Sequence, residues 1–244
     1  MNKKAQITLI ILIAVFIAII AALIIYAAGY FRNKNAIEPL AFDKARIESY
    51  INNCIKKTAE NGLKLLGKQG SISPDNYLQA PYFKIQYYFY NNQNKMPTIE
   101  KIQNELALYM NENLGTCLKD FEDFKKQGWN VEKGSINSKA GINEQDVSFE
   151  INFPIKVINK VDTISFEKFA SRLNVRLKYI YNLVSAIADF NTKYQKSIDR
   201  TALNNYDVNV TVFPYENSLV YSIDDSKSFI MNSPYRFNFA LKFE

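Results

Sequence analysis

An uninterrupted apolar stretch near the N-terminus constrains this chain more than any other feature. No charged residue occurs from Gln6 to Phe31, and Leu9 to Ala28 is apolar except for one phenol. A bilayer core of about 30 Å needs about 20 apolar residues in a helix, which satisfies its own backbone hydrogen bonds in lipid. The sequence therefore predicts a single transmembrane helix from Leu9 to Ala28.

A cleaved secretory signal is the alternative interpretation of this stretch. Such signals have a shorter apolar region of about 7–15 residues and a small-x-small cleavage site. Ala27 and Gly29 offer that site, but the run is longer than this class uses, which favours a retained anchor. Lys3, Lys4 and the α-amine favour a cytoplasmic N-terminus, which predicts a single-pass protein of the cell membrane with its C-terminal domain outside.

Four residues at the start of the run carry a resemblance to a processing signal. The segment Lys4-Ala5-Gln6-Ile7 resembles the class III signal peptide of archaeal type IV pilin-like proteins. The resemblance implies that a prepilin-type peptidase cleaves between Ala5 and Gln6 and that the helix is retained. An ordinary signal anchor, whose lysines only set the topology, stays open as the alternative. Bacterial type IV pilins carry a glutamate near the start of this helix, and its absence argues against that subclass.

The remainder of the chain predicts one packed domain outside the membrane. With 16 tyrosines and 17 phenylalanines it is too aromatic for a disordered stalk. The predicted organisation has four parts: a basic leader at 1–5, a transmembrane segment at 6–31, a polar neck at 32–42 and an extracytoplasmic domain at 43–244.

Hydrophobic periodicity predicts the elements of this domain. A spacing of three and four residues predicts helices at 43–67, from Thr98 to about 124, and at 166–198. Alternation with a period of two predicts strands at 83–89, 147–157, 208–212 and 235–243. Clean alternation is typical of an antiparallel sheet that is wet on one face. The expected fold class is α+β: a single N-terminal transmembrane helix, then an antiparallel sheet with two or three helices packed on one face.

A second resemblance covers most of the chain. Two segments carry it. One is ENGLKLLGKQGS, which lies between a cysteine on the first predicted helix and a second cysteine on a later one, and the other is the closing PYRFNFALKF. In these segments the chain resembles exported, membrane-anchored proteins of small-genome archaea of the DPANN kind. The resemblance implies no particular activity. The chain departs from it at QGS, where QGG is expected.

The two cysteines, Cys54 and Cys117, predict a disulfide. Both lie on apolar faces of separate predicted helices, and an exported domain sits where disulfides persist. Two cysteines allow one intramolecular pairing. The alternative is a pair of reduced thiols packed as small hydrophobes.

The sequence offers little catalytic chemistry. With no histidine, imidazole bases, Ser-His-Asp triads and His-metal sites are excluded. Two distant cysteines cannot form a four-thiolate zinc site, and there is no P-loop. Ser165 and Lys168 match a bare S-x-x-K, but Ser165 is better explained as a helix N-cap. Asp224 and Asp225 are better explained by a hairpin turn than by a calcium site.

No catalytic residue, cofactor or metal is therefore predicted. The net charge of +6 is spread along the chain rather than clustered, so no nucleic-acid partner is expected. Asn209 begins an N-x-T sequence and is the glycosylation candidate. The chance occurrence of this tripeptide in an Asn-rich chain is the alternative.

Three functional hypotheses follow. The first is a membrane-anchored cell-surface protein with a structural or binding domain and no catalysis. The second is a subunit of a type IV pilus-like filament. The third is an exported hydrolase that uses carboxylates or Ser/Lys chemistry. The expected partners are the lipid bilayer, envelope or surface proteins and the prepilin-type peptidase.

Overall fold

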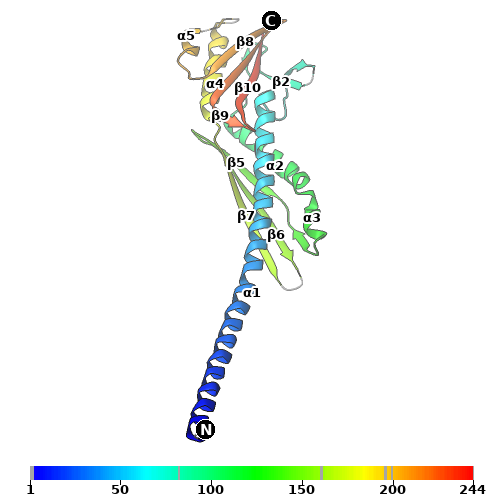
Figure 1. Cartoon of the computed structure of the whole chain (residues 1–244). Coiled ribbons are helices and arrows are strands. Elements are labelled where there is room, and N and C mark those ends of the chain that lie inside the picture. The colour runs from blue at the N-terminus through cyan, green and yellow to red at the C-terminus, as the bar shows by residue number, and fades with distance from the viewer. Residues whose placement is uncertain (1–2, 82, 160–161, 195–196, 199, 244) are drawn as a thin grey trace. The chain divides into compact units, whose positions relative to one another are not determined.

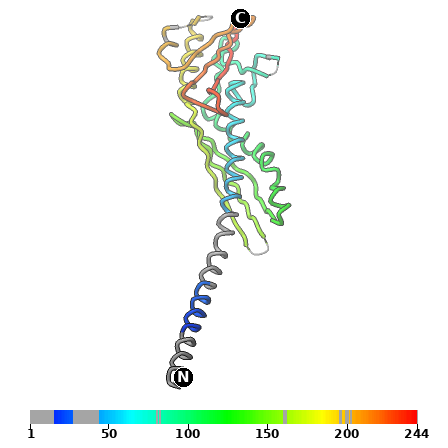
Figure 2. Tube along the Cα trace, viewed as in Figure 1, coloured from blue at the N-terminus to red at the C-terminus, as the bar shows by residue number. Residues whose placement is uncertain are grey.

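The structure, a computed structural model, describes residues 3–81, 83–159, 162–194, 197–198 and 200–243 (Figure 1). In the first helix, α1 (Lys3–Gln69), side chains are described for residues 16–27 and from residue 44 onward (Figure 2). The chain divides into two compact units, Met1–Ser49 and Tyr50–Glu244.

The described side chains of the first unit correct the predicted membrane anchor. In the part of the chain that the structure describes, no helix is both long enough and apolar enough to cross a membrane. The side chains of Leu9 and Ala28, the predicted limits, lie outside the described part. The predictions of a transmembrane helix and of a single-pass membrane location are therefore wrong.

The second unit is α+β, but it contains two sheets where one was predicted. The first has the order β1 (Tyr77–Ala80), β2 (Phe83–Tyr90), β10 (Ser233–Lys242), β9 (Ser218–Ile230), β8 (Asn209–Tyr215), and β3 (Gln93–Asn94) also pairs with β2. In the second, β6 (Val147–Ile158) pairs with β4 (Asn130–Lys133), β5 (Asn137–Ile142) and β7 (Thr163–Leu173). The second sheet is antiparallel throughout, whereas β2 and β10 of the first are parallel.

The remaining helices are α2 (Ile99–Leu118), the 3-10 turn η1 (Lys119–Phe121), α3 (Glu122–Lys125), α4 (Leu177–Lys193) and α5 (Arg200–Leu203). Thr98 caps α2, because its hydroxyl accepts a hydrogen bond of 3.2 Å from the amide of Lys101. The helix stops at Leu118, since Lys119, Asp120 and Phe121 all have left-handed backbone angles.

The predicted helix at 166–198 is wrong in its first part. Residues through Leu173 belong to strand β7, and α4 begins only at Leu177. The register of β7 against β6 shifts between Lys168 and Phe166, so Phe166 and Phe169 are both buried although three residues apart. A spacing of three is a helical signal, and the β-bulge here imitates it. Ser165 accordingly lies within β7 and caps no helix.

The end of α1 packs directly on the first sheet. The phenol of Tyr235 on β10 donates to the carbonyl of Leu63 (3.2 Å), and Tyr88 on β2 donates to that of Gly70 (2.6 Å). The backbone carbonyl of Arg236 comes so close that a Cβ on Gly67 would lie 2.2 Å from it. Strand β2 has no wet face, because a cluster of Ile85, Tyr87 and Ala240 buries its other side.

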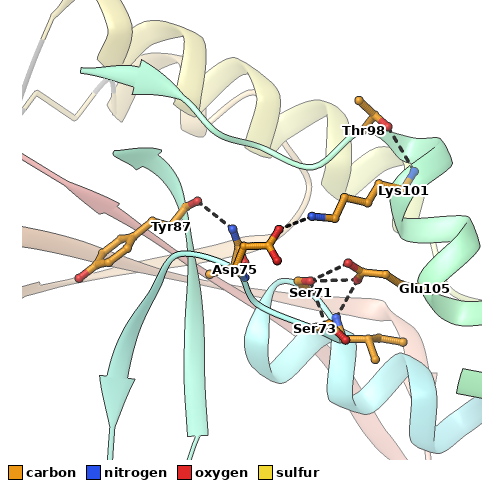
Figure 3. Close-up of polar contacts among 9 residues, drawn as sticks. Ser71, Ser73, Asp75, Tyr87, Thr98, Lys101 and Glu105 are labelled. Carbon is orange, nitrogen blue, oxygen red and sulfur yellow. Dashed lines mark hydrogen bonds and ion pairs between the residues drawn. The ribbon is translucent and has the colours of Figure 1, made fainter. Parts of the chain in front are cut away.

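The loop after α1 is held to α2 by polar contacts (Figure 3). The carboxylate of Glu105 accepts hydrogen bonds from the hydroxyl of Ser71 (2.9 Å) and the amide of Ile72 (2.9 Å). Lys101, one turn earlier on α2, forms an ion pair of 2.5 Å with Asp75. The polar groups in these contacts are paired with one another, and the contacts position the loop that leads into β1 and β2.

A disulfide joins Cys54 on α1 to Cys117 on α2, as the sequence predicted. Their Cα atoms lie 5.6 Å apart, within the range that a disulfide spans. Tyr50 adds to this junction, because its hydroxyl donates to the carbonyl of Leu118 (2.8 Å) and its ring meets the edge of Phe124.

Candidate functional site

An open depression of about 910 Å³ lies beside the start of β8, the start of β10 and the part of β9 around Asp224 and Ser226. Its polar and aromatic lining consists of Tyr206, Asp207, Asn209, Asp224, Ser226, Ser233 and Arg236. All of these residues belong to the second unit.

A β-bulge explains why the sheet is hollow here. Tyr235 of β10 pairs with Asp225 of β9, but the preceding Pro234 pairs with Phe229. Residues 226–228 therefore have no counterpart on β10, and the strand bends away from its neighbour. Pro234, which has no amide hydrogen to donate, is well suited to this position.

Ion pairs fix the charged side chains at the rim. Arg236 lies opposite Asp224 in the strand register, and its Nε donates to the carboxylate at 2.7 Å. Asp207 pairs with Lys227 from the bulge. The hydrogen bond from Lys227 is the main reason why the pKa of Asp207 lies below its ordinary value. Both carboxylates of the depression thus have a cationic partner within the protein.

A buried ion pair supports the bulge from behind. Asp225 is fully buried, and Arg176, at the start of α4, donates to its two oxygens at 2.6 and 3.1 Å. The hydroxyl of Ser228 and the amide of Lys227 donate to the same carboxylate. Burial alone would raise the pKa of Asp225, but these hydrogen bonds outweigh it and hold the pKa below its usual value.

The same arginine also orders the segment before β8. Its Nη2 donates to the carbonyl of Asp207 (3.2 Å), and its guanidinium lies 4.7 Å from the ring centre of Tyr179. The hydroxyl of Tyr179 accepts the amide hydrogen of Asp207 (2.8 Å), and its ring meets Tyr206 edge-on. The walls of the depression are therefore built by a connected network rather than by separate contacts.

This arrangement suits binding through hydrogen bonds. The rim presents carboxylate oxygens, hydroxyls, an amide and a guanidinium beside one aromatic ring. Among the residues that the structure describes, no group of three or more His, Cys, Asp or Glu is placed to hold a metal ion.

The site residues named from the sequence fall in different places. Asn209 is exposed and opens β8 at the depression, and its glycosylation stays a prediction. Cys54 and Cys117 lie in their disulfide between α1 and α2. The side chains of Lys4, Ala5 and Gln6 lie outside the described residues, so processing there also stays a prediction.

Sequence reasoning missed the polar network because it placed Asp224 and Asp225 in a turn, whereas β9 runs through both. A signal was present. Tyr221, Ile223 and Asp225 share one parity of the alternation, which puts a carboxylate on the buried face. A buried carboxylate requires a cation, and that requirement points to an arginine such as Arg176.

Comparisons of the chain with protein-family models, with curated proteins and with solved structures found no match to any of them.

Proposed function

We propose that this protein is a binding protein whose depression at β8, β9 and β10 receives a neutral ligand rich in hydroxyl groups, such as an oligosaccharide. The pairing of the rim charges is the observation that carries this proposal: Asp224 is held by Arg236, and Asp207 by Lys227. A charged ligand would have to displace one of these partners. A neutral ligand can instead use the lone pairs and N–H groups that the pairs leave free.

The ring of Tyr206 supports the same ligand class. It lies half-buried at the wall, where its face can cover the apolar side of a sugar ring while polar neighbours meet the hydroxyls. The depression is open along the sheet and admits a chain-like ligand lying across it. The disulfide suits work in an oxidising environment. The proposed role is binding, with no reaction assigned to the site.

The test is binding of the purified full chain to a panel of neutral and acidic oligosaccharides, followed by calorimetry of the best ligand. Asp224→Asn should weaken binding about tenfold, the value of one charge-assisted hydrogen bond. The matched control is Asp120→Asn, which removes an exposed carboxylate that is paired with a lysine and lies far from β8 in sequence, and this variant should bind as the wild type does. Preference for acidic ligands, or unchanged binding by Asp224→Asn, would refute the proposal.

A second candidate function is that of a subunit of a filament, as the class III resemblance implies. Residues 16–27 of α1 are all exposed, including the large apolar side chains Phe16, Ile17, Ile19, Ile20, Leu23, Ile24, Ile25 and Tyr26. A helix that is apolar all round requires burial, and copies of the same helix can provide it.

Sedimentation and electron microscopy of the full chain without detergent test this candidate. Fibres should form, and Ile20→Lys should abolish them, whereas Asn53→Lys at an exposed polar position of α1 should not. A chain that stays monomeric at all accessible concentrations contradicts it.

A further inference from the structure

A small cavity lies between α4 and β9, next to the depression, and Tyr206 lines both. Its volume is about 90 Å³, and its lining is mainly apolar, with Leu183, Ile187 and Phe190 from α4 and Leu203 from α5. Tyr221 of β9 forms part of the wall. The space exceeds the roughly 30 Å³ that one water occupies in the liquid, but is smaller than the 150 Å³ cavity that admits benzene.

One polar atom in this lining lacks a partner. Asn191, near the end of α4, is 1% exposed, and its Nδ2 donates to the carbonyl of Ile187 at 3.0 Å. Its Oδ1 is buried and has no hydrogen-bond partner among the described residues. The side chain of Asn191 also hydrogen-bonds the phenol of Tyr221. Oδ1 itself still lacks a donor, and a buried acceptor left unpaired costs about 1–3 kcal/mol.

We propose that the cavity binds a small amphiphile, with an apolar body of about four carbons and one hydroxyl or amine that donates to Oδ1 of Asn191. The size follows from the volume, and the apolar body follows from the side chains of α4 and α5. The single donor follows from the unpaired amide oxygen. The cavity shares Tyr206 with the depression, but its ligand is argued from Asn191 and the apolar lining and does not rest on the proposed oligosaccharide.

The test is a titration of the ¹⁵N-labelled full chain with 1-butanol, followed by NMR. Saturable shifts should appear at amides of α4 and at Tyr221. Methyl propyl ether, an isomer of butanol with an acceptor but no donor, should bind about tenfold more weakly, because it leaves Oδ1 unpaired.

Asn191→Leu provides the matched variant. Because this variant removes the unpaired acceptor, the preference for butanol over the ether should disappear. The unfolding midpoint of the variant in urea shows whether it is folded. The proposal fails if butanol gives no saturable shift in the wild type, as would happen if a bound water satisfies Oδ1. It also fails if butanol and the ether bind equally well.

Discussion

Two neighbouring aspartates on β9 perform opposite tasks. Asp225 is fully buried, whereas the side chain of Asp224 is 26% exposed and pairs with an arginine that is 63% exposed. Breaking a buried ion pair costs about 3–5 kcal/mol, and a surface pair contributes at most about 1 kcal/mol. We expect Asp225→Asn to lower the free energy of unfolding in urea by about 3–5 kcal/mol and Asp224→Asn by less than about 1 kcal/mol. Equal losses would contradict this assignment.

The buried carboxylate also predicts how stability depends on pH. The pKa of Asp225 is lowered in the folded protein, so its contribution is complete above the ordinary pKa of an aspartate, about 3.9. It is lost as the pH falls below that value and through the folded-state pKa. The free energy of unfolding, measured from pH 6 to pH 2.5, should fall more steeply for the wild type than for Asp225→Asn. Parallel curves would show that another group is responsible.

For individual residues, the sequence predicts which side chains can react or pair better than it predicts which side chains meet in the fold. The pairing of Cys54 with Cys117 was predictable because only two cysteines exist. Arg176 and Asp225, in contrast, are 49 residues apart, and nothing in their local patterns links them. Their meeting depends on how α4 docks against β9, which is a tertiary property.

Helix α1 approaches β10 so closely that one glycine is required. A Cβ at Gly67 would lie 2.2 Å from the carbonyl oxygen of Arg236, whereas a Cβ at Gly115 on α2 would have no neighbour within 4 Å. We expect Gly67→Ala to destabilise the fold by about 1–3 kcal/mol through overpacking. Gly115→Ala should stabilise it by about 1 kcal/mol, because alanine has the higher helix propensity. Thermal unfolding distinguishes the two variants. If Gly67→Ala leaves the stability unchanged, α1 can shift away from β10 at little cost.

The disulfide links α1 and α2 covalently. It closes a separation of 63 residues, for which the chain-entropy model gives about 4 kcal/mol. Reduction should lower the free energy of unfolding, measured in urea, by about that amount, and the urea midpoint should fall with it. The variant Cys54→Ser/Cys117→Ser should match the reduced wild type, which separates the cross-link from side-chain packing. An unchanged midpoint after reduction would assign the stability to packing alone.

Elements with clean alternation were predictable, and those with interrupted patterns were not. Strands β6 and β10 match the predicted ranges because their buried residues alternate almost without exception. The sequence of β7 has a helical spacing because the register shift against β6 leaves Phe166 and Phe169 both buried, three residues apart. The division into two sheets was not predictable, since alternation shows which residues share a face but not which strands pair.

For the whole molecule, the second compact unit should fold without the first. Both sheets, the disulfide and helices α2 to α5 lie within Tyr50–Glu244. A chain of residues 44–244 should therefore give one cooperative thermal transition, with the near-ultraviolet circular dichroism of the full chain. A broad transition, or loss of that spectrum, would show that residues before 44 are needed for folding.

The place of the last strand has a consequence for biosynthesis. Strand β10 lies between β2 and β9 in the first sheet but follows both of them in the chain. During synthesis, β2 and β9 therefore each present an unpaired edge, open to other chains, until β10 has left the ribosome. A nascent chain stalled before Ser233 cannot join these two strands, and it becomes a client for chaperones that shield strand edges.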